Sequence, residues 1–113
     1  AKQQNIRLNE GTYTYTIGPS YETSAEIDEI IHLKGDAVGM STFPEFLMCN
    51  KTQLNTVFIA CLTNYGAGLI KNKKINHQDV LKGAAKSKKE FCELITRTIE
   101  NIGHQKILMM ISS

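Results

Sequence analysis

The first half of the chain shows two different spacings of hydrophobic residues. Residues 12–17 alternate strictly between small polar and large side chains, the pattern of a β-strand. Thr23 and Glu26 then have the spacing of a capping box, which predicts that a helix begins there and runs to about residue 34. Gly35 is the expected C-cap. The apolar side chains of this helix share one face, formed by Ile27, Ile30 and Ile31.

A second strand and helix are predicted directly afterwards. Residues 36–39 are short and apolar enough to form a buried strand of an α/β unit. Thr42 and Glu45 have the spacing of a second capping box, and Pro44 is compatible with a first helical turn. Residues 40–42 would then lie at a helix N-terminus, where free amides and the helix dipole favour an anion such as phosphate.

The segment 55–63 predicts a third strand, because its apolar residues occupy both faces, as in a parallel strand covered by helices on each side. Asn64 would lie at the C-terminal end of that strand, the edge where open α/β sheets bind ligands. Residues 65–75 are rich in Gly and Lys without a clear period, which predicts a mobile loop.

The last predicted element is a long helix. Asn76 can cap it, with Asp79 at the third helical position, and Gly103 marks its end before an apolar extension at 107–111. A buried stripe is expected at Val80, Ala84, Phe91, Ile95 and Ile102. The exposed face is expected to carry Lys82, Lys86, Lys88 and Lys89.

Composition narrows the possible classes without naming a function. The 113 residues have room for one α/β domain, and a net charge of +2 from 13 basic and 11 acidic residues does not indicate nucleic acid or an anionic membrane as the main partner. Three widely spaced cysteines predict neither a disulfide framework nor a zinc site, so a reducing cytosol is expected. Neither a membrane-spanning run nor a leader is recognised, and residues 1–8 resemble the end of a helix that has already begun.

Four separated motifs resemble those of one family. Gly18-Pro19-Ser20-Tyr21-Glu22-Thr23, then Asp36-Ala37-Val38-Gly39-Met40-Ser41-Thr42, then Thr63-Asn64, and finally Asn76-His77-Gln78-Asp79-Val80-Leu81 are similar in order and spacing to the C-terminal part of the trimeric purine nucleoside phosphorylases. The resemblance extends from about residue 10 to residue 102. It implies the C-terminal portion of the nucleoside phosphorylase fold, a central mixed β-sheet flanked by helices.

The resemblance also implies an activity, the phosphorolysis of inosine or guanosine to the free purine and ribose 1-phosphate, with no cofactor and no metal. By family analogy Glu22 and Asn64 are the catalytic residues that contact the purine. The substrate-binding residues would be Tyr21, Val38, Gly39, Met40 and His77. Ser41 would contact phosphate.

The family's main phosphate-binding loop has no counterpart in these 113 residues. We therefore expect the chain to be the C-terminal part of a single phosphorylase domain, to be inactive by itself, and to need the N-terminal part, supplied by the same or a separate polypeptide. The resemblance further implies a cytoplasmic homotrimer of the complete protein.

Two other functions stay open from the sequence. A methylthioadenosine phosphorylase shares the fold, but that family has Asp at the position of Asn64, lacks the carboxylate at Glu22 and has an apolar pocket at His77. These three positions favour 6-oxopurines. A non-catalytic purine-nucleoside-binding subunit is the second alternative.

Overall fold

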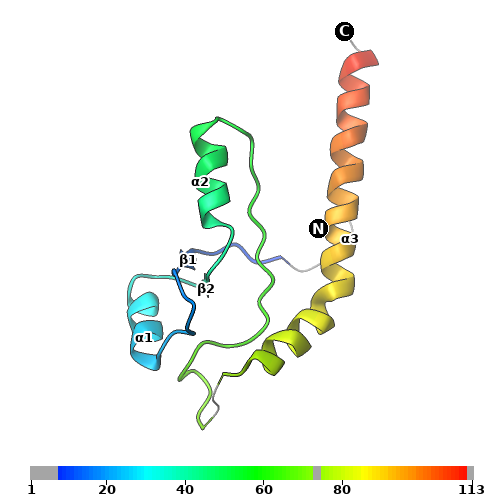
Figure 1. The fold of residues 1–113 in the computed structure, drawn as a ribbon. Helices are drawn as coiled ribbons and strands as arrows, with labels where there is room; N and C mark the ends of the chain where they lie inside the picture. Colours follow the sequence, from blue (N-terminus) through cyan, green and yellow to red (C-terminus); the bar gives the residue numbers. More distant parts are fainter. Residues whose placement is uncertain (1–7, 73–74, 112–113) are drawn as a thin grey trace.

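The computed structural model describes residues 8–72 and 75–111, with side chains described as far as residue 102. Five elements follow one another along the chain: β1 (Tyr13–Tyr15), α1 (Ser24–His32), β2 (Ala37–Gly39), α2 (Phe43–Lys51) and α3 (His77–Ile111). Figure 1 shows β1, α1, β2 and α2 gathered on one side, with α3 rising beside them. The expected helix end at residues 1–7 lies outside the described residues.

The two strands and the helix between them form a β–α–β unit. β1 and β2 pair in parallel, with Tyr13 opposite Ala37 and Tyr15 opposite Gly39. A parallel pair needs a crossover connection, which α1 provides. The strands predicted at 12–17 and 36–39 are therefore confirmed, each in a shorter form and half-buried.

Both ends of α1 are closed by local hydrogen bonds. The predicted capping box is present: the Glu26 amide donates to Thr23 Oγ1 at 3.3 Å, and the Thr23 amide donates to Glu26 Oε2 at 2.7 Å. At the other end the Lys34 amide donates to the Ile31 carbonyl and the Gly35 amide to the Ile30 carbonyl, a Schellman motif. The prediction for Gly35 was wrong by one residue, because Lys34 takes the left-handed position with φ of 62°.

The predicted second capping box was also wrong. Thr42 precedes α2 but has a left-handed backbone (φ 72°) and makes no capping hydrogen bond, whereas an N-cap normally has an extended backbone. Its hydroxyl instead contacts Ser41 Oγ at 3.4 Å. The predicted Pro44 in the first turn of α2 is confirmed.

Aromatic rings join α2 and the following segment to β1. The rings of Tyr13 and Phe58 have centroids 4.7 Å apart, and those of Phe46 and Phe58 are 6.2 Å apart. Tyr15 stacks on Phe43 with a centroid distance of 5.3 Å. These contacts make a small aromatic cluster beside the sheet.

The segment 55–63 is the largest difference from the sequence prediction. It is extended but belongs to no β-ladder, and Figure 1 shows it as a bare trace between α2 and α3. Val57 is 80% exposed and Leu62 is 66% exposed. A strand needs a neighbouring strand for its amides and carbonyls, and in the described part of the chain the only ladder is β1–β2.

The helix α3 is longer and more exposed than its pattern indicates. The capping bond from the Asp79 amide to Asn76 Oδ1 is confirmed at 3.0 Å, but the helix passes Gly103 and continues to Ile111. Leu94 is buried, whereas Ala84, Phe91 and Ile102 of the predicted stripe are exposed because no described element covers them. The four lysines predicted on the solvent-exposed face are confirmed as exposed: Lys82, Lys86, Lys88 and Lys89.

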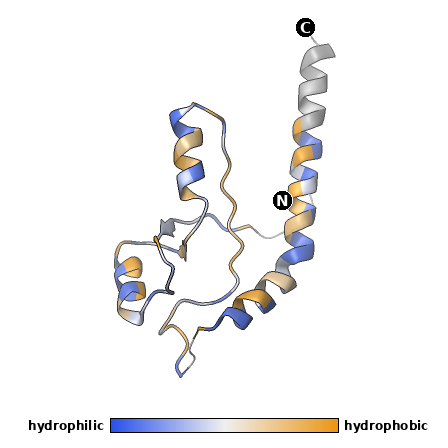
Figure 2. Ribbon diagram, in the orientation of Figure 1, coloured by the Kyte–Doolittle hydropathy of each residue, from blue (hydrophilic) through white to orange (hydrophobic). Residues whose placement is uncertain are grey.

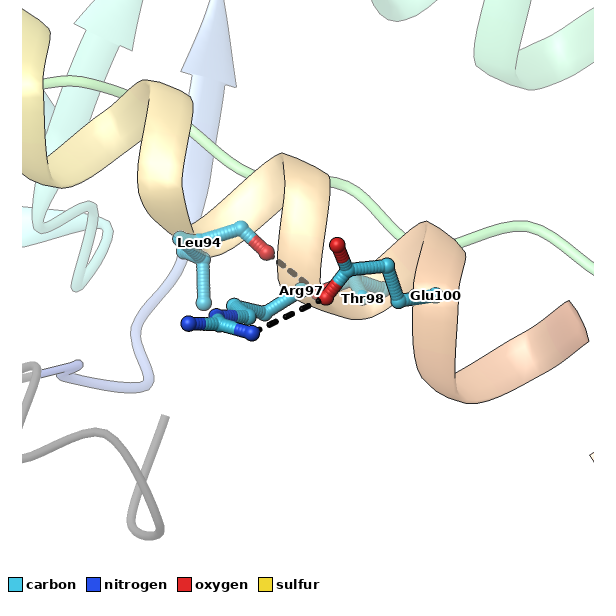
Figure 3. A network of polar contacts seen from close by, with 4 residues as sticks. All are labelled: Leu94, Arg97, Thr98 and Glu100. Atoms are coloured by element: carbon cyan, nitrogen blue, oxygen red, sulfur yellow. Dashed lines mark hydrogen bonds and ion pairs between the residues drawn. The ribbon is translucent and has the colours of Figure 1, made fainter. Parts of the chain in front are cut away.

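Polar contacts along α3 are mostly local. Figure 3 shows Thr98 Oγ1 donating to the Leu94 carbonyl at 2.7 Å and the Arg97–Glu100 ion pair at 3.2 Å. Both side chains of that pair are half-exposed, and such surface pairs add little stability. Figure 2 shows apolar and polar residues alternating along the coloured part of this helix. Its exposed apolar side chains, such as Ile99, would need a partner to become buried.

The accessible surface area and the radius of gyration agree with the high exposure of segment 55–63 and α3. The accessible surface is 9910 Å², whereas a compact monomer of 12.6 kDa is expected to have about 6200 Å². The radius of gyration is 17.4 Å, against about 13 Å for a compact domain of this length. Only Ile27 and Leu94 are buried hydrophobic residues among those described. The described helices include none with the length and hydropathy of a membrane span.

Candidate functional site

The turn after β1 carries the first predicted site residues. Gly18 has φ of 68°, a conformation that favours glycine, and the Gly18–Pro19 peptide is cis. Tyr21 is exposed at this turn. Glu22 is half-buried, and its Oε1 accepts a hydrogen bond of 2.6 Å from Thr16 Oγ1. The carboxylate is thus tied to the strand that precedes the turn.

The end of β2 brings the second group beside this turn. The Thr16 amide donates to the Gly39 carbonyl at 3.0 Å, and the Tyr13 hydroxyl donates to the Ser41 carbonyl at 3.1 Å. The thioether of Met40 packs on Gly18, where an added Cβ would lie 2.5 Å from its sulfur. Parallel pairing therefore places residues 39–41 against the turn at 18–22, as the carboxyl ends of parallel strands share one edge.

Ser41 is exposed, and the backbone after it is not a free helix N-terminus. The Phe43 amide, the first of α2, donates to the Ser41 carbonyl at 2.9 Å. This contact occupies the Phe43 amide at the start of α2 and leaves the expectation for the amides of residues 40–42 untested. Val38 lies in β2, half-buried, opposite Thr14.

Asn64 is held by its neighbours in sequence. Its Oδ1 accepts from Thr63 Oγ1 at 2.7 Å, and its Nδ2 donates to the Tyr65 carbonyl at 3.1 Å. The side chain is exposed. An amide nitrogen carries two hydrogens, so one N–H of Asn64 remains available as a donor.

Two close backbone contacts place Asn64 between α3 and α1. The Thr63 carbonyl lies so near Gly83 of α3 that a side chain at residue 83 would collide with it. Beyond Asn64, Gly66 packs on Ile27 of α1, where an added Cβ would lie 2.9 Å from the Ile27 Cδ1. Residues 63–66 thus contact α3 at one end and, at the other, α1, which begins two residues after Glu22.

His77 is less closely integrated. It is the first residue of α3 and is exposed, and among the described residues no hydrogen bond or ion pair joins it to another predicted site residue. Residues 67–72 form turns and bends, which confirms a loop before α3, and residues 73–74 are outside the described part.

One carboxylate beside the site has a pKa shifted by its hydrogen bonds. The pKa of Glu26 is lowered by its hydrogen bonds with the backbone amide and then the hydroxyl of Thr23, an effect of the helix cap. Among the side chains described, those of residues 8–72 and 75–102, no group of three His, Cys, Asp or Glu is arranged to hold a metal ion. Cys49, Cys61 and Cys92 are free thiols, and Cys61 and Cys92 are exposed.

Three residues that hold the site residues in place are not among those predicted from the sequence. Thr16 and Tyr13 make the hydrogen bonds that link the two turns, yet they were noted only as part of an alternating strand. Gly83 was not noted at all. A glycine in the middle of a helical pattern lowers helix stability, and that cost is a usable signal of a close backbone contact.

The comparisons with known proteins agree over most of the chain. Residues 1–100 match the model of the Phosphorylase superfamily. The chain is 38% identical over 95 residues to "Purine nucleoside phosphorylase 1" of Bacillus subtilis (strain 168), covering 84% of this chain and 35% of the relative. It is 35% identical over 96 residues to the "6-oxopurine nucleoside phosphorylase" of Pyrococcus furiosus, covering 85% of this chain and 36% of that protein.

A mammalian protein gives a similar result. The chain is 37% identical over 101 residues to the "Purine nucleoside phosphorylase" of Bos taurus, covering 86% of this chain and 35% of the relative. The chain thus spans little more than a third of the length of these curated relatives. The matched family model nevertheless covers most of its residues, and the chain belongs to the phosphorylase superfamily.

Proposed function

We propose that this chain supplies the nucleoside side of a purine nucleoside phosphorylase site. The observation that carries the proposal is the convergence of the two turns: Glu22 is hydrogen-bonded to Thr16, whose own amide is bonded to Gly39, next to Met40. Asn64 joins this group through the packing of residues 63–66 on α3 and α1. The names of the relatives support a purine nucleoside as the substrate.

The base would be recognised by Glu22 and Asn64. The Glu22 carboxylate is oriented by the bond at Oε1 and would accept from the purine N1–H through one oxygen, and from a 2-amino group, when one is present, through the other. The remaining N–H of Asn64 would donate to the base at N7 or O6. Tyr21, exposed at the turn, would lie against the base and the sugar.

The sugar and phosphate would be held by the end of β2 and the start of α3. Met40 would lie against the ribose, with Val38 and Gly39 lining the same strand end. His77 would bond the 5′-hydroxyl. Ser41 would reach the phosphate, although its carbonyl is already an acceptor for Tyr13.

The reaction follows from these contacts without a protein nucleophile. An oxygen of hydrogen phosphate forms a bond to C1′ while the C1′–N9 bond breaks, and its electron pair leaves with the purine. The proton lost by hydrogen phosphate balances the proton gained by the purine. Positive charge grows on the ribose and negative charge on the purine, so Asn64 would stabilise the leaving base. No cofactor is required for this step.

A second polypeptide segment would complete the site. The unpaired segment 55–63, with Val57 and Leu62 exposed, would become an interior strand of a mixed sheet flanked by helices. The segment covering it would be the remainder of the phosphorylase fold, carried by the same or another chain, and would bring most phosphate ligands. The complete protein would be a cytoplasmic homotrimer that acts in purine salvage.

The test is phosphorolysis of inosine, followed by ultraviolet absorbance as hypoxanthine is released. We expect turnover when residues 1–113 are combined with the rest of the fold, and none from these residues alone. Inosine cleavage by the purified 113-residue chain would contradict the need for a complement. A preference of the complete protein for methylthioadenosine would contradict the 6-oxopurine assignment, and nucleoside binding without turnover would identify a binding subunit.

A further inference from the structure

Thr16 connects three parts of the candidate site. It follows β1 directly, and its backbone amide donates to the Gly39 carbonyl at the end of β2 at 3.0 Å. Its side chain points to the turn at residues 18–22, where Oγ1 donates to Glu22 Oε1 at 2.6 Å. The residue therefore fixes the carboxylate relative to the strand end that carries Met40 and Ser41.

The bond from Thr16 uses only part of the acceptor capacity of the Glu22 carboxylate. A threonine hydroxyl has one hydrogen to donate, and a carboxylate offers about four acceptor positions on two oxygens. The 2.6 Å distance is typical of a short, charge-assisted O–H···O⁻ bond. In the described part of the chain no donor is bonded to Glu22 Oε2. One oxygen is anchored, and the second remains free for a ligand.

We propose that Thr16 is a positioning residue that holds Glu22 in a single orientation and thereby sets the preference of the site for purines with two N–H donor groups. A purine with a 2-amino group presents N1–H and N2–H side by side, and both are satisfied only when the two carboxylate oxygens lie in the plane of the base. A purine without that amino group donates only its N1–H to the carboxylate. One Glu22 oxygen satisfies it, even when the carboxylate group is rotated out of the plane of the base. The inference rests on the proposed function of the same site.

The same contact has a simpler structural interpretation, in which Thr16 only closes the turn between residues 16 and 22. The two interpretations differ in what they predict for specificity. Loss of a turn closure lowers stability and affects all substrates equally. Loss of an orienting bond changes the ratio between substrates, because it acts through the direction of the Glu22 oxygens.

The experiment compares Thr16→Val and Thr16→Ser in the complete, active protein. Valine keeps the shape of threonine without its donor, and serine keeps the donor. For Thr16→Val we expect kcat/KM to fall about tenfold for guanosine and about threefold for inosine, mainly through KM, as for a lost hydrogen bond to a charged group. Thr16→Ser is expected to restore the guanosine-to-inosine ratio. Thermal unfolding of each variant separates these effects from loss of folded protein.

Thr14→Val is the matched control. Thr14 lies in β1, two residues before Thr16, and its hydroxyl makes no hydrogen bond among the described residues. We expect its guanosine-to-inosine ratio to equal that of the parent protein. Equal losses for both nucleosides in Thr16→Val, or no loss, would overturn the inference while leaving the proposed function intact. A parent protein without activity on either nucleoside would overturn both.

Discussion

The β–α–β unit at residues 13–39 and the region from residue 52 onward differ in how their backbone and apolar groups are satisfied. In the first, a strand ladder, a capping box and a Schellman motif satisfy the chain locally, and Ile27 is 4% exposed. In the second, segment 55–63 has no ladder and Val57 is 80% exposed. The β–α–β unit finds its backbone hydrogen-bond partners within residues 12–39. Segment 55–63 depends on a partner strand from outside the described part of the chain.

The proposed chemistry needs both regions, since Glu22 belongs to the first and Asn64 to the second. Asn64→Ala removes the donor to the leaving purine, and we expect kcat to fall about 100-fold in the complete protein, the effect of losing one preorganised donor. Steady-state phosphorolysis of inosine measures it. Asn101→Ala, on the exposed side of α3, is the control. An Asn64→Ala variant with unchanged kcat would leave the second region without a catalytic role.

The difference in packing is tested by two truncations of branched aliphatic residues. Ile27→Ala is expected to lower the free energy of unfolding of residues 1–113 by about 3 kcal/mol, because a buried side chain leaves a cavity. Val57→Ala is expected to change it by less than about 0.5 kcal/mol, since Val57 is already in water. Urea denaturation gives both values. Equal effects would show that segment 55–63 is as well packed as α1.

Two threonines that precede helices differ in whether they make a capping hydrogen bond. Thr23 caps α1, so Thr23→Ala is expected to cost about 1 kcal/mol. Thr42 makes no capping bond, and Thr42→Ala is expected to cost less than about 0.5 kcal/mol. The difference between the two variants in urea denaturation is the measured quantity. A larger loss at Thr42 would indicate that α2 is capped after all.

Lys34 tests whether the Schellman motif carries strain. A side chain in the left-handed conformation is unfavourable, so Lys34→Gly is expected to raise the free energy of unfolding by about 0.5 kcal/mol. Lys86→Gly, in the interior of α3, should have the opposite sign because glycine weakens a helix. Destabilisation by Lys34→Gly would show that the lysine side chain contributes more than its backbone costs.

The smallest expected effect concerns acid pH. The capping box lowers the pKa of Glu26 below 4.5 in the folded chain, so its contribution to stability is present above pH 4.5. That contribution is lost as the pH falls through the lowered folded pKa, when the carboxylate becomes protonated. Glu26→Gln keeps a capping side chain without this titration and should flatten that part of the stability profile. Parallel profiles for the two proteins would assign the acid sensitivity to other groups.

Local signals in the sequence correctly predicted several elements. The Thr23–Glu26 and Asn76–Asp79 spacings predicted two helix starts, and the alternation at residues 12–17 predicted β1. The two helix caps are formed by residues three positions apart, whereas β1 also needs its partner β2, with Tyr13 opposite Ala37. The roles of Glu22, Asn64 and the other site residues stay predictions, because they depend on ligands.

Other features were decided only by the tertiary structure. Whether segment 55–63 forms a strand depends on a neighbouring strand, which no property of its own residues supplies. Thr42 had the residue type of a cap, but the connection from β2 into α2 gives it a left-handed backbone. The sequence by itself thus determined where the chain turns and which faces are apolar. Which apolar side chains are buried and which strands pair depends on contacts between residues far apart in the sequence, such as that of Thr63 with Gly83. The physical reason is that a strand needs a second strand for its hydrogen bonds and an apolar face needs a second apolar face to cover it.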